Sequence, residues 1–122
     1  MNEVINISTN KTQQFANLIR KYRKAHIGKG PEHVSVFFKD NWAVAHMKGS
    51  LSKVETFYLR NNAYHRMLKE GRTEEIKDLY KENPPIEMEE LVEAKFVKLF
   101  TDVDLENDEV VSIFVFDQNI ES

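Results

Sequence analysis

The sequence predicts an α+β fold in which a helix, a β-hairpin, a helical middle and a second β-hairpin form a four-stranded, mainly antiparallel sheet packed with helices. Three observations lead to this prediction. Apolar residues recur at helical spacing within residues 10–26, they alternate across residues 33–48, and the chain closes on an apolar stretch, residues 109–117. The length of 122 residues suits one domain, residues 1–122, with one hydrophobic core.

The first helix is predicted over residues 10–26, with Asn10 as its capping residue. One apolar stripe at helical spacing comprises Phe15, Leu18, Ile19 and Tyr22. Four basic residues are expected off this stripe, where they complement the negative end of the helix dipole: Arg20, Lys21, Arg23 and Lys24. The segment Gly28-Lys29-Gly30-Pro31, called the 28–31 loop below, ends the helix, because glycine accepts a left-handed closing conformation and proline cannot continue a helix.

Residues 33–39 and 42–48 are predicted to pair as a β-hairpin. One face of the first strand carries Val34, Val36 and Phe38. The two residues between the strands, Asp40 and Asn41, tolerate the positive φ that a tight hairpin turn requires.

The middle of the chain is predicted to be helical. Ser52-Lys53-Val54-Glu55 has the form of a capping box, which marks a helix start. Gly71 is expected to end this helix and Thr73 to begin the next one. The clearest break in the chain is Asn83-Pro84-Pro85, after which a short acidic helix is predicted over about residues 86–94.

Residues 95–103 and 109–117 are predicted to form the second hairpin. One face of the last strand carries Val111, Ile113 and Val115, and the other carries Val110, Phe114 and Phe116. Apolar residues on both faces indicate burial on both, yet helices in so short a chain are expected to cover only one. The sequence therefore predicts a homodimer, with the aromatic face near Phe100, Phe114 and Phe116 as its candidate interface.

The net charge of −3 conceals an uneven distribution. Residues 1–72 contain 13 Lys and Arg against 5 Asp and Glu, whereas residues 73–122 contain 4 against 15. Either the basic half binds an anionic partner, or the two halves face each other within one chain or across a dimer. The second interpretation is favoured, and nucleic-acid binding through the basic first helix ranks lower because the acidic half would repel phosphates.

No catalytic, metal-binding or cofactor-binding constellation is predicted. The chain has 0 Cys, and its four histidines occur without the spacing of a paired metal site. Asp102, Asp104 and Glu106 alternate like the first ligands of a calcium loop, but the glycine and final glutamate of such a loop are missing.

The 28–31 loop has two interpretations. It leaves a helix and enters a strand, which is the reverse of a phosphate-binding loop, so a structural turn is favoured. The alternative is a small anion-binding or catalytic domain in which Gly28, Lys29, Gly30, Pro31 and His33 contact the anion.

The whole pattern resembles the MpsC family, small bacterial proteins of unknown function. Over about residues 10–118, the resemblance lies in the 28–31 loop after an amphipathic helix, the segment Lys48-Gly49-Ser50-Leu51, Glu55, and a Val-rich strand that reaches Asp102. The chain departs from the family pattern at Ala94-Lys95, where glycine is common, and at the Asn83-Pro84-Pro85 break.

The family name refers to a sodium-translocating, membrane-potential-generating system, and members can be encoded beside membrane components that resemble bicarbonate uptake systems. The resemblance therefore implies a non-enzymatic accessory or regulatory subunit with a membrane-protein complex as partner. It supplies no catalytic residues; Glu55 and Asp102 match motif positions, with structural roles as a cap and a hairpin anchor. Without a signal peptide or an apolar run long enough to span a bilayer, this chain is expected to be soluble and cytoplasmic.

Overall fold

The computed structural model describes the backbone of residues 2–51, 53, 57 and 65–121. These residues form α1 (Asn2–Ile27), β1 (His33–Lys39), β2 (Trp42–Lys48), α3 (His65–Glu82), α4 (Ile86–Val92), β3 (Phe96–Asp104) and β4 (Glu109–Phe116). The predicted α+β class, with a four-stranded antiparallel sheet and helices, is confirmed. The predicted start of the second helix at residues 52–55 lies outside the described residues, apart from Lys53.

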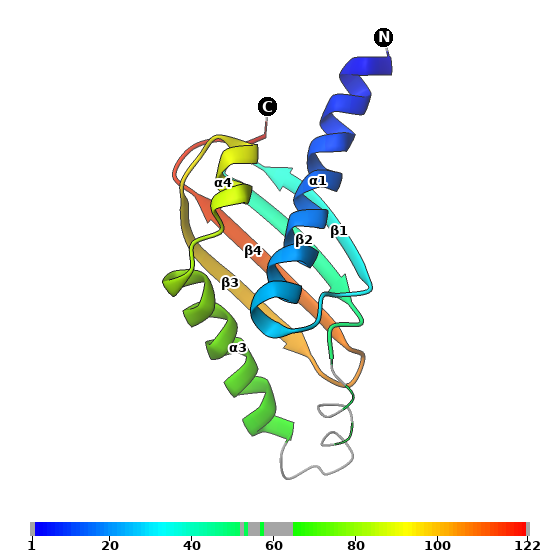
Figure 1. Ribbon diagram of the computed structural model, residues 1–122, viewed down its shortest axis with the longest axis vertical. Helices are drawn as coiled ribbons and strands as arrows, with labels where there is room; N and C mark the ends of the chain where they lie inside the picture. The colour runs from blue at the N-terminus through cyan, green and yellow to red at the C-terminus, as the bar shows by residue number, and fades with distance from the viewer. Residues whose placement is uncertain (1, 52, 54–56, 58–64, 122) are drawn as a thin grey trace.

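The strand order across the sheet is β1-β2-β4-β3, and all three pairings are antiparallel. Both predicted hairpins are present. In the first, Lys39 pairs with Trp42 across a two-residue turn, and Asp40 adopts a φ of 54°, as the turn prediction requires. β2 also pairs with β4, so the two hairpins join into one continuous sheet (Figure 1).

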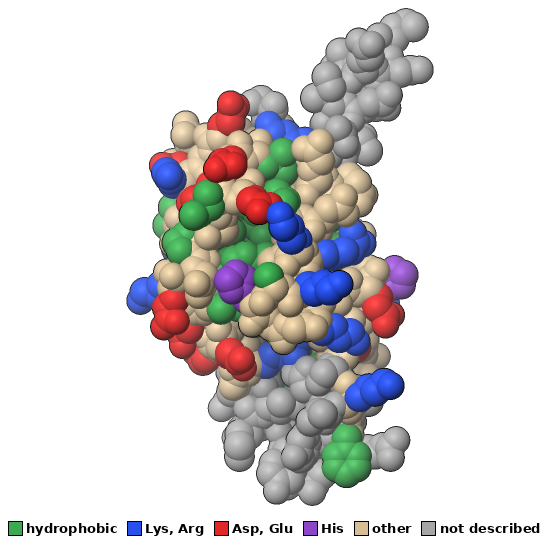
Figure 2. All heavy atoms as spheres, in the orientation of Figure 1, with side chains coloured by type: hydrophobic (Ala, Val, Ile, Leu, Met, Phe, Trp, Pro, Cys, Tyr) green, Lys and Arg blue, Asp and Glu red, His purple; other side chains and the backbone are tan. Residues whose placement is uncertain are grey.

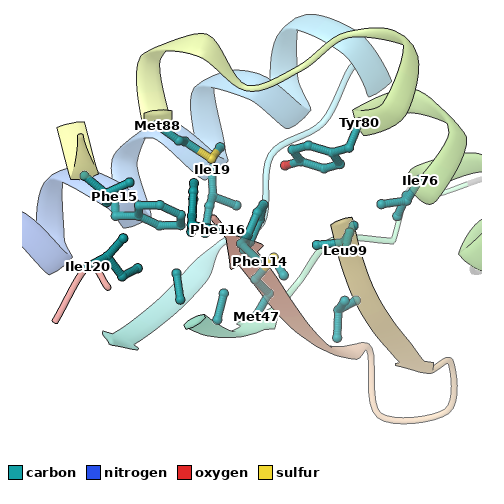
Figure 3. Close-up of a cluster of buried hydrophobic side chains, with 14 of the residues drawn as sticks. Phe15, Ile19, Met47, Ile76, Tyr80, Met88, Leu99, Phe114, Phe116 and Ile120 are labelled. Carbon is teal, nitrogen blue, oxygen red and sulfur yellow. The ribbon is translucent and has the colours of Figure 1, made fainter. Parts of the chain in front are cut away.

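All three described helices lie on the same side of the sheet (Figure 1). The hydrophobic core fills the space between them and the strands, as Figure 3 shows. Phe15 of α1 lies at its centre, with its ring centroid 5.3 Å from that of Phe114 and 6.2 Å from that of Phe116. Both contacts are edge-to-face, a geometry that favours aromatic pairs beyond the area they bury.

The burial of Phe114 and Phe116 corrects the predicted interface. Each ring is only 1% exposed beneath the helices, so neither can contact a second molecule. The prediction was wrong because β4 is apolar on both faces, and its alternation alone does not tell which face the helices cover. Phe100 differs, because it pairs with Ile113 and therefore lies on the opposite side of the sheet.

Two helix boundaries also differ from the predictions. α1 begins at Asn2, eight residues before the predicted cap at Asn10. α3 runs without a break from His65 to Glu82, so Gly71 does not end a helix and Thr73 does not begin one. Glycine is a poor helix former, but its cost of about 1 kcal/mol is readily offset when the helix packs against a core.

Replacing Gly71 by alanine is therefore expected to raise the free energy of unfolding by about 0.5–1 kcal/mol. A Cβ atom at this position would meet nothing within 4 Å. The contrasting variant is Gly30→Ala, whose Cβ would lie 2.9 Å from the carbonyl oxygen of Arg20, so a loss of stability is expected. Urea denaturation measures both, and a destabilised Gly71→Ala would contradict a continuous α3.

A stacked pair of tyrosines joins α1 to α3. The rings of Tyr22 and Tyr80 lie 4.2 Å apart at an interplanar angle of 10°, and the Tyr22 hydroxyl donates a 2.5 Å hydrogen bond to the carbonyl oxygen of Asn83. Burial raises the pKa of Tyr22 to about 12 and also raises the pKa of Tyr80, because an ionised phenol is poorly solvated there.

This tyrosine pair predicts an alkaline loss of stability. A group whose pKa is higher in the folded than in the unfolded chain contributes stability that is complete below its unfolded pKa, about 10 for tyrosine. That contribution is lost as the pH rises through the folded pKa of about 12. Tyr22→Phe is expected to reduce the fall in unfolding free energy between about pH 10 and pH 12; an unchanged slope would contradict the assignment.

Candidate interaction surface

The side of the sheet turned away from the helices, called the open face below, carries large apolar side chains that no described helix covers. The strand register sets four of them in one row across the whole sheet, called the apolar row: Phe37, Val44, Ile113 and Phe100. The two aromatic rings at its ends are among the most exposed, Phe37 at 59% and Phe100 at 46%.

The apolar surface extends to both sides of the apolar row at the two central strands, where Trp42, Val111 and Val115 lie. On one side of the apolar row lie Lys39, Trp42, Val115 and Lys98, and on the other lie Ser35, His46, Val111 and Asp102. Trp42 and Val111 are each 42% exposed. Contiguous exposed apolar patches rimmed by polar residues are typical of surfaces that contact a protein, a membrane or a ligand.

The charges on the open face are separated between its two ends. One end carries Lys39 and Lys98. The opposite end carries one lysine, Lys48, against three carboxylates, Asp102, Asp104 and Glu109. Counted over these paired strand residues, the two ends of the open face carry opposite charge; the adjoining turn adds the carboxylates of Asp40 and Glu121 beside Lys39.

Local contacts hold these charged groups beside the apolar row. The ammonium group of Lys98 lies over the ring of Phe100, 5.0 Å from its centroid. At the other end, a carboxylate oxygen of Glu109 lies 3.2 Å from the Nε2 atom of His46, and the other oxygen lies 3.6 Å from the Nζ atom of Lys48. Such exposed ion pairs add little stability but orient the side chains that a partner would meet.

The 28–31 loop is built as a turn. Gly28 takes a φ of 96° and its amide donates to the carbonyl oxygens of Arg23 and Lys24, which closes α1. The ammonium group of Lys29 donates a 2.7 Å hydrogen bond to the carbonyl oxygen of Leu51. His33 begins β1 on the open face, so the structure does not bring Lys29 and His33 to one site.

One of the two predicted motif residues can be placed in the structure, and one structural aspartate was not predicted from the sequence. Asp102 lies on the open face of β3, while Glu55 lies outside the described residues. The hairpin anchor is Asp108, whose Oδ1 atom accepts hydrogen bonds from the backbone amides of Ser50 at 3.0 Å and Leu51 at 3.1 Å. An aspartate in a polar turn is the only signal in the sequence for this role.

The basic and acidic halves of the sequence lie against each other within the chain. The strand order places β2 beside β4, and Lys21 of α1 forms a 2.8 Å ion pair with Glu87 of α4. Figure 2 shows Lys and Arg side chains gathered over α1 and acidic side chains toward α3 and α4. Among the described residues, no three His, Asp or Glu side chains converge as a metal site would require.

The fold and surface define a small α+β protein with helices on one side of its sheet and an apolar face on the other. The chain belongs to the MpsC family, described as "Na+-translocating membrane potential-generating system (MpsC)", whose family model matches residues 8–118. It is 43% identical over 111 residues to the uncharacterized protein YrhF of Bacillus subtilis (strain 168), and the match covers 91% of each chain. No solved structure gives a significant match.

The family description names a membrane potential-generating system. Within the part of the chain that the structure describes, no helix combines the length and the apolar character needed to cross a bilayer.

Proposed function

We propose that this protein is a non-enzymatic accessory subunit that acts as a homodimer, with two copies packed through their open faces. The observation that supports this proposal is the apolar row, which extends across all four strands and ends in exposed aromatic rings. Burying such a surface against a second copy removes apolar area from water, the main driving force for association.

The charges of the open face complement a two-fold arrangement. Homodimers are most often related by a two-fold axis, across which each surface meets its own copy. An axis along the apolar row places the row against itself and reverses the two ends of the sheet. Lys98 of one copy then lies toward Asp102 of the second copy, and the reciprocal pair forms on the other side of the axis.

The geometry of the sheet suits this arrangement. Stacked sheets pack about 10 Å apart with their strands about 30° from alignment, and their facing side chains interdigitate. Val44 and Ile113 occupy the two central strands, whereas Phe37 and Phe100 lie on the edge strands, toward the two ends of the axis. The larger rings are thus placed to fill the outer parts of the interface.

Light scattering at micromolar concentration tests the dimer. The mass is expected to be twice that of one chain, and dilution is expected to lower it toward the mass of one chain. A mass of one chain throughout a concentration series up to the millimolar range would contradict the proposal.

The accessory role in a membrane system is supported by the family description. A tagged chain, expressed in its own host and recovered after mild detergent solubilisation, is expected to retain an integral membrane protein that the tag alone does not. Recovery of no membrane component would contradict the accessory role. The dimer is tested separately by the mass that light scattering gives.

A further inference from the structure

Arg20 and Lys24 lie four residues apart and therefore share the outer side of α1, where Arg20 is partly exposed and Lys24 is exposed. Arg23, predicted to lie off the apolar stripe with them, is only 1% exposed, so the prediction was wrong for that residue. The guanidinium group of Arg20 donates a 2.9 Å hydrogen bond to the side-chain oxygen of Asn17. Among the described residues, no carboxylate forms an ion pair with Arg20 or Lys24, so both charges are available to an external anion.

The chain beyond α1 adds two more cations beside this pair. A Cβ atom on Gly30 would lie 2.9 Å from the carbonyl oxygen of Arg20, so the 28–31 loop folds back along α1. The ammonium group of Lys29 holds the carbonyl oxygen of Leu51 at 2.7 Å, which brings the segment with the exposed Lys53 next to the end of α1. Four residues define what is called the cationic surface below: Arg20, Lys24, Lys29 and Lys53.

Acidic residues border the cationic surface. Between Val4 and Pro31 the chain contains no Asp or Glu, and Glu32 follows directly after the 28–31 loop. Four carboxylates of α3 line the same cleft as Lys29: Glu74, Glu75, Asp78 and Glu82. Positive and negative surfaces thus lie side by side on the helix side of the molecule (Figure 2). A protein of net charge −3 with this distribution is expected to turn its α1 side toward a negatively charged surface.

Exposed apolar side chains accompany the cationic surface. Ile27, the last residue of α1, is 36% exposed, and Phe57, four residues after Lys53, is 65% exposed. The interface of a lipid bilayer accommodates both kinds of side chain, because cations stay among the headgroups while apolar groups enter the layer beneath them. A duplex nucleic acid presents phosphates without such an apolar layer, so the exposed Ile27 and Phe57 favour a bilayer.

We propose that the cationic surface binds the headgroups of an anionic lipid bilayer, with Ile27 and Phe57 entering the interface. The choice of a bilayer among anionic partners rests on the accessory role in a membrane system proposed above. The cationic surface lies on the helix side of the sheet, so packing of two copies through their open faces leaves it accessible. Each Lys or Arg close to an anionic membrane strengthens binding about fivefold.

Co-sedimentation of the purified chain with lipid vesicles tests the proposal without any membrane protein. Vesicles that contain phosphatidylglycerol in phosphatidylcholine are expected to bind the chain at least about tenfold more tightly than phosphatidylcholine alone. Binding should weaken steeply as the ionic strength rises from about 0.1 M to about 1 M, because the Debye length falls from about 10 Å to about 3 Å. Equal binding to both kinds of vesicle, or binding that salt does not weaken, would overturn the proposal.

The double variant Arg20→Ala, Lys24→Ala is expected to weaken binding to the phosphatidylglycerol vesicles about 20-fold, because it removes two of the four cations. The matched control is Lys77→Ala, Lys81→Ala, which removes two positive charges, also four residues apart, from α3. The control is expected to bind within about twofold of the wild type, since salt screens charges outside the contact. Alanine favours helices, so both double variants should retain the wild-type circular dichroism spectrum. Equal losses in the two variants would overturn the assignment to the cationic surface.

Phe57→Ala is expected to weaken vesicle binding several-fold and to leave its salt dependence unchanged, and an unaltered affinity would contradict insertion of this ring. Binding of duplex DNA or RNA with no binding to the phosphatidylglycerol vesicles would assign the surface to another partner and overturn the proposal. Failure of the vesicle test is distinguishable from failure of the accessory role, which is measured by the recovery of an integral membrane protein.

Discussion

Phe114→Ala is expected to destabilise the folded chain by about 3–5 kcal/mol, as for other large aromatic residues removed from a core. The ring packs edge-to-face against Phe15 at 5.3 Å and Tyr80 at 5.3 Å, so its loss leaves a cavity between both long helices and the sheet. Since small domains have total stabilities of about 5–15 kcal/mol, this variant should approach complete unfolding. Urea denaturation followed by circular dichroism measures the loss.

Phe100→Ala is the matched control, because it removes the same ring from the open face. Its cost is expected to depend on protein concentration, since it weakens association, whereas the cost of Phe114→Ala should appear at every concentration. Equal, concentration-independent losses in the two variants would contradict the assignment of these rings to opposite sides of the sheet.

Phe37→Glu is expected to raise the dissociation constant of the dimer about 100-fold or more. Each copy would place a carboxylate at the end of the apolar row, and two-fold symmetry applies the penalty twice. Truncating a well-packed aromatic residue typically costs 2–4 kcal/mol of binding free energy, and a buried unpaired charge adds to that loss. Sedimentation equilibrium measures the constant.

The control for charge is Lys81→Ala, which changes the net charge by the same amount at an exposed residue of α3. It is expected to leave the dissociation constant unchanged, and far-ultraviolet circular dichroism should show both variants folded. An undiminished dimer in Phe37→Glu would place the interface elsewhere on the molecule.

The hairpins were predictable because they depend on local signals. Asp40 and Asn41 have the turn chemistry, and the alternation on either side gave β1 and β2 their observed bounds. The pairing of β2 with β4 joins segments more than sixty residues apart, and no local pattern specifies it. The apolar row exists only through that pairing, so the extent of the open face could not be read from the sequence.

Arg23 and the β4 rings show a second limit of sequence patterns. Arginine is almost never fully buried, so Arg23 was predicted to lie off the apolar stripe of α1. The structure buries it, because it follows Ile19 by four residues and therefore lies on the same face of the helix. On β4 the opposite problem arises, because apolar residues occupy both faces. The prediction of an apolar face left for a partner stays a prediction, now carried by Phe100 rather than by Phe114 and Phe116.

Cross-linking through a single introduced cysteine tests the central claim most directly, because the native chain has 0 Cys. Ile113→Cys lies near the proposed two-fold axis, where each residue meets its own copy, and Glu74→Cys on the exposed side of α3 is the control. A short bifunctional maleimide is expected to convert Ile113→Cys largely into covalent dimer while Glu74→Cys stays monomeric. Equal yields from the two variants, or none from Ile113→Cys, would contradict the open-face dimer.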